Sequence, residues 1–539
     1  MKMVKSNYSR NSKAKKLKIS TNEDRISSLP NNLIHEILSF LDMKHAARTS
    51  ILSTRWRDLW TSIPTLNFNS TVFLESTRKT SKDKDRFIDF IDQVFVHHDK
   101  SSVQTFRFFY NDSRHLPPKR VYSWVVALVR RNVQELVIDI PASLHYLLSV
   151  PLCLFNCASL TVLKLQFERL YVPLALPHFI SLPLLLTLHL KSVNFLDEDL
   201  TSKLFSSCPV LESLVIVDCR FGKMKKLIIS GLKLKHLMIE TGRYENFSFY
   251  KQFYCKITIF APNLVSLRLK DHLGRDYVIE DLSFLVTADI DMENEMMVEM
   301  DHSTAMIPAE VKNEYAERVV RCWKAVCNVR SLTIAPWMLE DLRELSLIWM
   351  HSVQLRTSVV YLSSIYDSSR FLAFIFYFLQ GCLKSPVALV EALSLQFRNL
   401  KHLKLITWLS GDCICGITYL LNICPKLESI NINIIKREVY SHDGDRGIIL
   451  SSITSKYEGT GLTLQCMYYL KYVEIQGIVG CPNGLHFLEI LLKNALVLAK
   501  MLIFASKERL PNKEKKLMRF IERLQEVPRA SSNNAILFL

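Results

Sequence analysis

Glycine is scarce in this sequence, with only 14 residues among 539. Glycine-rich loops let backbone N–H groups surround a phosphate, and the chain has neither a P-loop pattern nor a dinucleotide fingerprint. It also lacks the G-x-S-x-G turn that presents a serine nucleophile. No other constellation of acids, bases and nucleophiles stands out, so we expect a protein without catalytic activity of its own.

Metal-ligand spacing is also missing. His35 and Glu36 begin like the helix of a zinc protease, but Ser39 stands where the second histidine is needed. The 13 cysteines are odd in number and scattered. Their closest pairs lack the spacing of a zinc site, so we expect free thiols and no cofactor. These pairs are Cys153/Cys157, Cys322/Cys327 and Cys413/Cys415.

Apolar runs are short. The longest notable one, Phe371–Leu379, has nine residues, whereas a membrane-spanning helix needs about 20. The basic N-terminus carries no secretory signal and the cysteine usage suits reduced thiols, so we expect a soluble protein of the cytoplasm or nucleus without a membrane partner. A hydrophobic share of 49% is that of a folded chain, and 539 residues suit several domains or a repeat array.

The formal net charge of +16 is concentrated at the two ends. Residues 1–20 hold seven basic side chains and no acid, and residues 500–529 hold nine basic and four acidic ones. The middle is therefore close to neutral and has no basic stripe that could follow a nucleic-acid backbone, so we expect no nucleic-acid partner. The Lys13–Lys18 cluster is either a solvated tail, which we favour, or a nuclear import signal.

A compact helical unit is predicted between Asp24 and Trp60. Pro30 suits the first turn of its first helix, Asp42 can cap a second helix and Ser53 a third. Trp56 and Trp60 lie one turn apart on the third helix, so they either belong to the core or face a partner. The apolar positions at three- and four-residue steps are Leu33, Ile34, Ile37, Leu38 and Leu41.

The residues of this stretch also follow a long ordered pattern. It reads D-R-I-S-x-L-P-x-x-[LI]-[LI]-x-x-I-L-S-F-L, then K-x-A-x-x-[TS]-x-[IL]-L-S-x-R-W-R-x-L-W, almost without gaps. This order closely resembles the F-box, specifically its plant version. The departures are small, since Asn31, Asp42 and His45 stand where the family often has Asp, Pro and an acid.

After this unit, Thr77–Arg86 contains no apolar residue and is predicted to be an exposed loop. Helical spacing then returns with Phe87, Phe90, Ile91, Val94 and Phe95.

From Val103 onward an apolar triplet at i, i+3 and i+5 recurs, which is the strand pattern of a leucine-rich repeat. Seven triplets follow one another at steps of 23 to 30 residues, and each repeat of this kind buries its apolar face only against its neighbours. They are Val103/Phe106/Phe108, Val133/Leu136/Ile138, Leu160/Leu163/Leu165, Leu185/Leu188/Leu190, Leu211/Leu214/Ile216, Leu234/Leu237/Ile239 and Leu264/Leu267/Leu269.

The pattern then becomes less regular. The acidic run from Asp289 to Asp301 lacks the glycine and the closing glutamate of a calcium loop, so we interpret it as an acidic surface loop. An irregular insertion follows at about 340–390, and its part Trp349–Cys382 is either a poorly ordered insertion or a stretch absent from the mature coding sequence. The triplets of this region are a weak copy, Leu285/Ala288/Ile290, and then Val329/Leu332/Ile334, Leu400/Leu403/Leu405 and Leu427/Ile430/Ile432.

The C-terminal residues form a further recognisable unit. A helix is predicted at Leu485–Asn494, and Pro511 precedes a basic amphipathic helix. The order L-K-x-V-E-I-x-G … P-R-A-S-S, over about Tyr457–Leu539, resembles the FBD region of plant F-box proteins. The strand triplets of this unit are Leu470/Val473/Ile475 and Leu498/Met501/Ile503, and the apolar residues of the last helix are Leu517, Phe520, Ile521 and Leu524.

These resemblances together imply a plant F-box/leucine-rich-repeat protein with a C-terminal FBD region, of the α/β class. We expect a basic, disordered tail (1–23), a small three-helix F-box (24–65) and a connector (66–100). A horseshoe-shaped leucine-rich-repeat solenoid (101–456) and an α/β FBD region (457–539) should follow.

The resemblance also implies a function. Such a protein is the non-catalytic substrate-recognition subunit of a Skp–cullin–F-box ubiquitin ligase, in which the F-box binds the Skp-family adaptor and, through it, the cullin. The repeats bind an unknown target protein and bring its lysines close to the ubiquitin-loaded enzyme. The alternative is a leucine-rich-repeat interaction scaffold outside any ligase.

The adaptor-binding residues follow from the family's pattern alone. Spacing leaves open which of them contact the adaptor and which stay internal. They are Leu29, Pro30, Ile34, Ile37, Leu38, Leu41, Leu52, Trp56 and Trp60.

Overall fold

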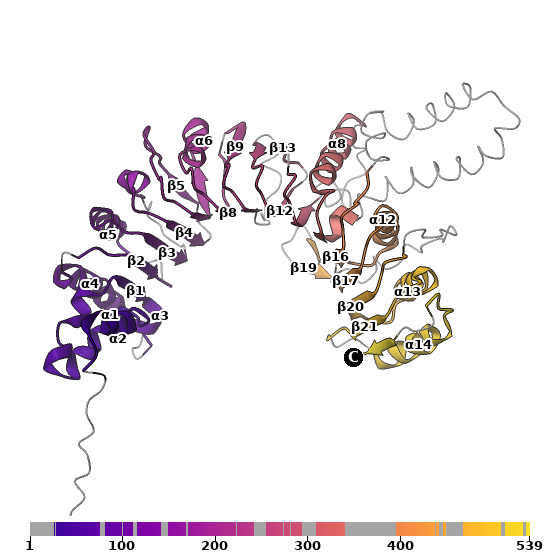
Figure 1. Ribbon diagram of the computed structural model, residues 1–539, viewed down its shortest axis with the longest axis horizontal. Coiled ribbons are helices and arrows are strands. Elements are labelled where there is room, and N and C mark those ends of the chain that lie inside the picture. Colours follow the sequence, from indigo (N-terminus) through magenta and orange to yellow (C-terminus); the bar gives the residue numbers. More distant parts are fainter. Residues whose placement is uncertain are drawn as a thin grey trace, which may run out of the picture. The chain divides into compact units, whose positions relative to one another are not determined.

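The computed structural model divides the chain into two compact units, Met1–Arg107 and Phe108–Leu539. We call them the N-terminal unit and the repeat unit, and describe each by itself (Figure 1). The structure describes residues 26, 28–75, 81–99, 101–111, 116–141, 149–168, 171–222, 224–241, 255–272, 274–280, 282–293, 309–339, 395–436, 438–440, 446–448, 467–507, 513–531 and 535–539.

The N-terminal unit begins with two short α-helices, α1 (Asn31–Ser39) and α2 (Met43–Arg48). Asp42 caps α2 as predicted, because its carboxylate accepts a hydrogen bond from the His45 N–H at 3.1 Å. The predicted third α-helix is wrong. After α2 the chain makes three 3₁₀ turns, η1 (Thr49–Ile51), η2 (Thr54–Trp56) and η3 (Leu59–Ser62), and the last two occupy the residues predicted as the third helix.

The failure of the third helix has a local cause. Ser53 precedes η2 in an extended conformation, and its hydroxyl makes no capping hydrogen bond. Without a capped N-terminus, a helix this short has little intrinsic stability, and tight turns that place Trp56 inside are favoured. Apolar spacing by itself does not distinguish such turns from an α-helix.

The rest of this unit is more ordered than expected. Residues 65–97 form β1 (Thr65–Asn69), α3 (Ser70–Phe73) and α4 (Ser81–His97), and β2 (Thr105–Phe109) begins at the end of the unit. The predicted helix through Phe87 is confirmed as α4. The predicted loop Thr77–Arg86 is wrong for residues 81–86, which belong to α4, and residues 77–80 lie outside the described chain.

Aromatic rings form the core between these elements. Phe68 of β1 lies 6.1 Å from Phe90 and 5.8 Å from Phe106, measured between ring centroids. Phe73 lies 5.1 Å from Phe87. Such spacings are those of attractive ring pairs, so β1, α3 and α4 are held together by one aromatic cluster.

The repeat unit is built on a parallel sheet, and the triplets form its strands. Every triplet residue from Val133 to Ile503 is buried. The strands of the main sheet, in spatial order, are β3 (Glu135–Pro141), β4 (Val162–Glu168), β6 (Thr187–Lys191), β8 (Ser213–Val217), β10 (His236–Glu240), β12 (Ser266–His272), β14 (Thr287–Glu293), β15 (Ser331–Ile334), β16 (His402–Thr407), β17 (Ser429–Ile434), β20 (Tyr472–Ile478), β21 (Lys500–Ala505) and β22 (Ala535–Phe538).

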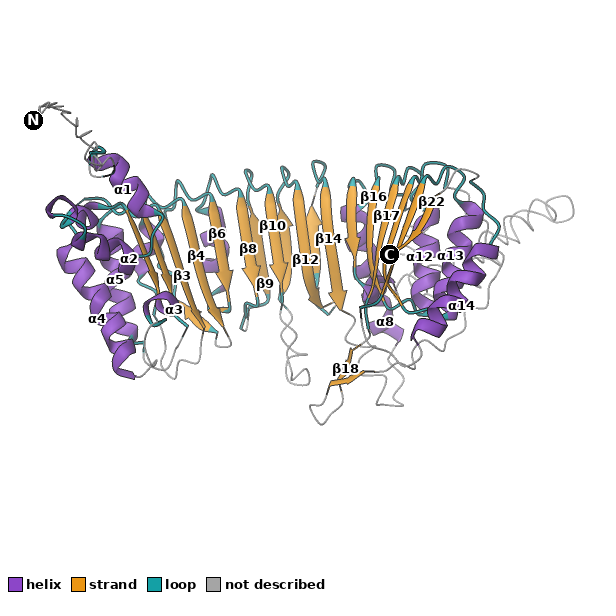
Figure 2. Ribbon diagram, turned by 90° about the horizontal axis from the view of Figure 1, so that it is seen from below, coloured by secondary structure: helices purple, strands orange, loops and turns teal. Residues whose placement is uncertain are grey.

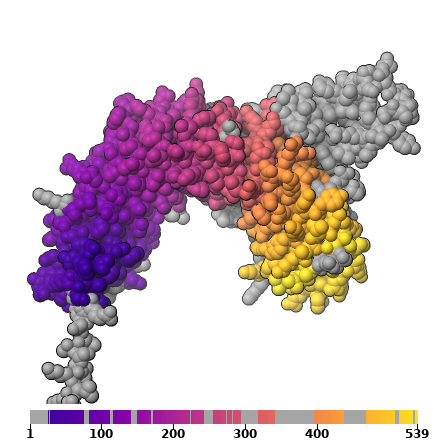
Figure 3. Space-filling model, in the orientation of Figure 1, coloured from indigo at the N-terminus to yellow at the C-terminus, as the bar shows by residue number. Residues whose placement is uncertain are grey.

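The register between strands follows the triplets. Leu188, Leu214 and Leu237 lie opposite one another on β6, β8 and β10. Because strand side chains alternate between the two faces, each strand directs its triplet into the core and its intervening residues onto the exposed face. Figure 2 shows the strands side by side, and in Figure 3 the colours of this unit succeed one another without mixing, so neighbours in sequence are neighbours in space.

The irregular region keeps the same register. The weak triplet lies on β14, where Ala288 is paired with Leu267 of β12 and Leu332 of β15. The acidic run is therefore only partly a loop. Asp289 and Asp291 belong to β14, and the run beyond Glu293 lies outside the described residues.

The long insertion does not interrupt the sheet. Leu332 of β15 is paired with Leu403 of β16, so the chain leaves one repeat and re-enters at the adjacent one. Packing continues across this join, since Trp337 and Trp408 are in edge contact with ring centroids 4.6 Å apart. Trp349–Cys382 itself lies outside the described residues.

Helices and short strands cover the other side of the main sheet (Figure 1). They include α5 (Pro118–Arg130), η5 (Leu152–Asn156), α6 (Glu198–Ser206), α8 (Ala309–Val326), α12 (Gly411–Asn422), α13 (Pro482–Asn494) and α14 (Lys513–Glu526). The short strands on this side are β5 (Val172–Leu174) with β7 (Val193–Phe195), and β9 (Lys226–Ser230) with β11 (Lys256–Phe260) and β13 (Tyr277–Glu280). A separate antiparallel pair is formed by β18 (Glu438–Tyr440) and β19 (Arg446–Ile448).

The C-terminal predictions are confirmed in their order. The expected helices are α13 and α14, and both C-terminal triplets lie on strands, β20 and β21. One further strand, β22, was not predicted and pairs in parallel with β21. Among the described helices, none is both long and apolar enough to cross a membrane.

Candidate functional site

Helix α1 has two adjacent apolar faces with different surroundings. Ile34 and Leu38 are buried in the N-terminal unit, whereas Leu33 and Ile37 are 42% and 46% exposed. Phe40, directly after the helix, is 84% exposed. A helix of a small domain normally exposes polar residues on its solvent face, so this face is available for a partner.

The turn after α2 exposes further apolar side chains. Ile51 is 85% exposed and Leu52 is 66% exposed. Arg55, three residues later, donates hydrogen bonds to the Leu29 carbonyl and, at 3.1 Å, to Asn31 Oδ1. These hydrogen bonds connect the start of α1 to η2, and η2 begins two residues after Leu52 in the sequence. We define the F-box apolar surface as the exposed residues Ile26, Leu33, Ile37, Phe40, Ile51 and Leu52.

The nine predicted adaptor-binding residues fall into three groups. Pro30, Ile37 and Leu52 are exposed, and Leu29, Leu41 and Trp60 are half-buried. Ile34, Leu38 and Trp56 are 0%, 1% and 4% exposed. These last three are core residues in this structure, so any part they take in binding is to support the surface.

Four exposed residues of this surface were missed by the sequence reasoning, namely Ile26, Leu33, Phe40 and Ile51. Leu33 was recognised as an apolar position of the helix but was not included among the adaptor-binding residues, although it precedes Ile37 by four residues and shares its side of the helix. Phe40 and Ile51 follow helix ends, where periodicity gives no orientation. The only available signal was that both are large apolar residues in a unit too small to bury all of them.

The surroundings of this surface are mainly cationic. Arg48, Arg55 and Arg57 are exposed, and Glu36 and Asp58 are the exposed acids of the described part of the α1–η3 segment. A partner with an apolar groove and an acidic rim would match this distribution of charge.

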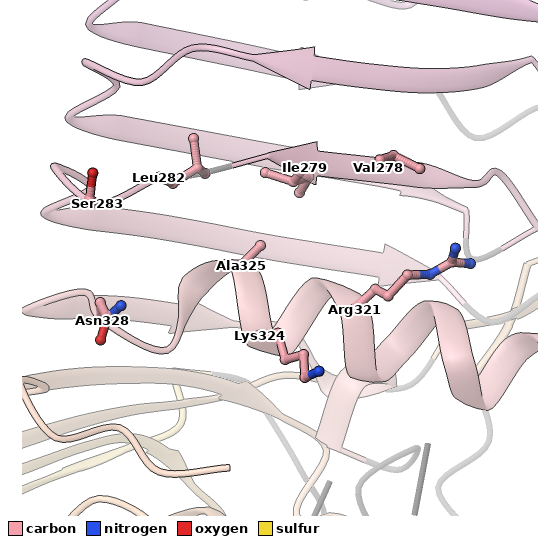
Figure 4. A pocket seen from close by; sticks show the side chains of 8 residues that line it. All are labelled: Val278, Ile279, Leu282, Ser283, Arg321, Lys324, Ala325 and Asn328. Atoms are coloured by element: carbon pink, nitrogen blue, oxygen red, sulfur yellow. The ribbon is translucent and has the colours of Figure 1, made fainter. Parts of the chain in front are cut away.

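The repeat unit holds a shallow pocket of about 370 Å³ between β13 and α8. Among the described residues its lining contains no carboxylate, imidazole or thiol, which are the side chains that usually bind a metal, and its ionisable groups are Arg321 and Lys324. Its lining residues, labelled in Figure 4, are Val278, Ile279, Leu282, Ser283, Arg321, Lys324, Ala325 and Asn328.

The cysteines of the described chain form no disulfide with one another. Burial raises the pKa of Cys208, Cys219 and Cys322 to about 12, so these thiols stay protonated and unreactive. The described residues also contain no group of three or more potential metal ligands.

Two family models match parts of the chain. The F-box domain matches residues 26–67. The leucine-rich repeats of FBD-associated F-box protein At5g56370 match residues 121–277. The first match contains the whole F-box apolar surface, and the second contains β3 to β12.

Three proteins of Arabidopsis thaliana are among the similar sequences. F-box/FBD/LRR-repeat protein At1g78750 is 34% identical over 50% of this chain and 57% of its own length. FBD-associated F-box protein At4g10400 is 34% identical over 50% of this chain and 61% of its own length. F-box/FBD/LRR-repeat protein At1g51370 is 26% identical over 97% of both chains.

The matches to the first two relatives thus span little more than half of their lengths, whereas the third runs end to end. The order of F-box, repeats and C-terminal strand–helix elements agrees with their names. The chain thus carries an F-box and FBD-associated leucine-rich repeats, and it is similar to plant F-box/FBD/LRR-repeat proteins.

Proposed function

We propose that the protein is a non-catalytic substrate-recognition subunit of a Skp–cullin–F-box ubiquitin ligase, acting in the cytoplasm or nucleus. F-box proteins generally have this role, and the F-box model covers residues 26–67. The F-box would bind the Skp-family adaptor, and the repeats, with the horseshoe curvature expected of such a solenoid, would bind the target. Catalysis would then rest on proximity of the target's lysines to the ubiquitin-loaded enzyme.

The exposure of the F-box apolar surface is the observation that carries this proposal. Phe40, Ile51 and Leu52 are 84%, 85% and 66% exposed. Burying a side chain of this size is worth about 1.5–3 kcal/mol, and a few such anchors dominate the binding energy of a typical interface. Ile34, Leu38 and Trp56 would hold the surface in place from below without touching the adaptor.

Charge substitutions on this surface test adaptor binding. The double variant Ile51→Asp/Leu52→Asp should weaken binding to a purified Skp-family adaptor by about 30-fold or more, because two anchors would carry buried charges. Val96→Asp is the matched control, since Val96 is 73% exposed on α4 of the same unit and outside the surface. Binding can be measured by titration calorimetry with the full chain.

Equal affinities of the wild type and the double variant would overturn the proposed docking surface. The ligase role is tested separately, by co-purification of cullin and by stabilisation of bound proteins when the gene is silenced. Adaptor binding without cullin would favour the interaction scaffold instead.

A further inference from the structure

Strand β17 carries two side-chain amides on the exposed face of the main sheet. Asn431 and Asn433 alternate with the buried triplet residues Ile430 and Ile432, so both amides point away from the core. Both asparagines are half-buried. Figure 1 shows α12 and α13 together on one side of β16, β17 and β20, which is the side of the core, so these two helices do not cover the amides.

This pair of amides is not a general feature of the repeats. The corresponding positions of β12 hold Arg268 and Lys270, which are paired with carboxylates of adjacent strands, and those of β8 hold Val215 and Val217. Among the described strands of the main sheet from β3 to β22, β17 is the only one with an amide at both positions. Its function is therefore local to this part of the sheet.

The fold does not use the two amides. Among the described residues, no group forms a hydrogen bond with the side chain of Asn431 or Asn433. Strand β1 of the N-terminal unit also has two asparagines, Asn67 and Asn69, and there Asn69 Oδ1 accepts hydrogen bonds from the N–H and the hydroxyl of Thr71, at 3.0 and 2.6 Å. Each amide of β17 instead keeps its carbonyl acceptor and its NH₂ donor for a ligand.

Strand β16 places a cation and an apolar side chain next to the amides. Lys404 faces Asn431, and Ile406 faces Asn433. Lys404 is exposed, and no described carboxylate forms an ion pair with it. Its charge favours the ionised form of Asp289 on β14, two strands away, without a direct contact. A carboxylate of a ligand can therefore approach Lys404.

Strand β20 places an anion on the other side of the amides. Glu474 faces Asn431, and Gln476 faces Asn433. The Glu474 carboxylate accepts hydrogen bonds from the Tyr472 hydroxyl at 3.1 Å and from Gln476 Nε2 at 2.7 Å. Both partners are uncharged, and no described cation forms an ion pair with Glu474. The two amides thus lie between a cation on β16 and an anion on β20.

The spacing of the two amides matches that of an extended peptide. Alternate residues of a strand are about 6.6 Å apart, and so are alternate residues of an extended ligand that lies along β17. Alternate backbone N–H and C=O groups of this ligand can therefore bond to both asparagines, because an amide side chain accepts from an N–H and donates to a C=O. The side chains of the ligand then project alternately toward β16 and toward β20.

We propose that Asn431 and Asn433 bind the backbone of an extended segment of the target protein, with an acidic side chain beside Lys404 and a basic side chain beside Glu474. This inference rests on the proposed target-binding role of the repeats, and it adds a place on the sheet and a sequence pattern. The acid and the base are adjacent in the segment, because Lys404 and Glu474 flank the same asparagine. A large apolar residue two positions from the acid lies beside Ile406.

A random dodecapeptide phage library tests this inference with the full chain. The phage are first depleted on the variant Asn431→Thr/Asn433→Thr, in which threonine suits a strand but lacks the amide, and are then selected on the wild type. We expect the enriched peptides to contain an acid next to a base and an apolar residue two positions from the acid. A selected, synthesised peptide should bind the variant about tenfold more weakly than the wild type, because the hydrogen bonds of both amides to its backbone are lost.

Matched variants separate recognition from folding. Val215→Thr/Val217→Thr places the same residues at the corresponding positions of β8, and should bind the peptide like the wild type. Lys404→Glu should weaken binding of the selected peptide. It should bind a peptide with lysine in place of the acid more tightly than the wild type does, because the charge pair is restored. Circular dichroism establishes that each variant is folded.

Methylation of the peptide backbone tests the hydrogen bonds directly. N-methylation of one alternate set of residues should abolish binding to the wild type, and N-methylation of the other set should leave the affinity nearly unchanged, because only one set directs its N–H groups toward β17.

Equal affinities of the wild type and the asparagine variant, equal weakening by the β8 variant, equal effects of the two methylated sets, or no enrichment after depletion would each overturn the inference. These outcomes are distinct from a failure of the proposed ligase role. Adaptor binding is measured on the F-box apolar surface of the N-terminal unit, which none of these substitutions changes.

Discussion

Helix α1 and the strands of the repeat unit use the same kind of residue in opposite ways. Every triplet residue of the repeat unit is buried against neighbouring repeats, so the apolar side chains of the pattern serve the fold itself. Helix α1 buries Ile34 and Leu38 but leaves Leu33 and Ile37 exposed. Its second apolar face therefore contributes less burial to the unit than the first.

The two regions therefore differ in how much of their apolar surface is buried inside the protein. In the repeat unit, apolar burial provides stability, and the other face of the strands carries mainly polar and half-buried residues. In the F-box, part of the apolar surface stays exposed, and the unit depends more on caps and on local hydrogen bonds. Four substitutions test this contrast.

The largest effect is expected from a triplet residue. Leu188→Ala should lower the free energy of unfolding by about 2–5 kcal/mol, because Leu188 is fully buried between Leu163 and Leu214 and its removal leaves a cavity. Ile51→Ala, at 85% exposure, should change stability by less than about 0.5 kcal/mol. Urea unfolding of both variants measures the two changes in the free energy of unfolding. Similar losses in both variants would contradict the contrast between the two regions.

The next largest loss of stability is expected where α12, which follows the long insertion, approaches Leu339, which precedes it. A Cβ added at Gly416 of α12 would lie 2.0 Å from the carbonyl oxygen of Leu339. Gly416→Ala should therefore destabilise the protein by about 1–3 kcal/mol through forced separation of the two backbones. At Gly484 of α13 the nearest atom would be Cys481 Sγ at 3.3 Å. The thermal unfolding temperature of Gly484→Ala should consequently stay close to that of the wild type, and an equal fall in both variants would contradict the close approach.

A cap tests the local stabilisation of the F-box. Asp42→Ala removes the acceptor of the His45 N–H and should cost about 1 kcal/mol. Asp58→Ala is the control, because the Asp58 side chain makes no capping bond to η3. Chemical unfolding of both variants can be followed by tryptophan fluorescence, to which Trp56 and Trp60 of this unit contribute. The measurement compares the free energies of unfolding of Asp42→Ala and Asp58→Ala. No difference between them would show that α2 does not depend on its cap.

The smallest effect concerns pH and the exposed face of the repeats. The pKa of His189 is lowered from 6.5 to about 4, so the unfolded state binds the extra proton first. The stability that the neutral imidazole contributes is complete above pH 6.5 and is lost as the pH falls toward 4. Since the ring is partly exposed, solvent screening reduces the effect to about 1 kcal/mol. Between pH 7 and pH 4 the wild type should lose that much more stability than His189→Gln. Parallel losses in the two proteins would contradict the lowered pKa of His189, which burial causes first and the charges of Lys164 and Lys191 second.

Sequence reasoning predicted the repeats better than the F-box, for a physical reason. The triplet occurs thirteen times, and each copy lies between two other repeats. One local pattern therefore predicts the same buried environment for every copy, including the weak copy on β14. The triplet Ile63/Leu66/Phe68 around β1 was nevertheless missed. It directly follows η3, so no earlier repeat in the sequence sets the spacing at which a triplet is expected.

The sequence by itself determined the F-box pattern, the buried positions of the repeats, the cap at Asp42 and the order of the C-terminal elements. These features depend on local periodicity and on residue identity, and both can be read directly from the order of residues. Only the tertiary structure decided which apolar face of α1 is buried and that two 3₁₀ turns bury Trp56 in place of a helix. It also placed His189 of β6 opposite Lys164 of β4, and Arg268 and Lys270 of β12 beside carboxylates of adjacent strands. Each of these depends on groups brought together from distant parts of the chain, and burial and charge compensation are properties of that assembly.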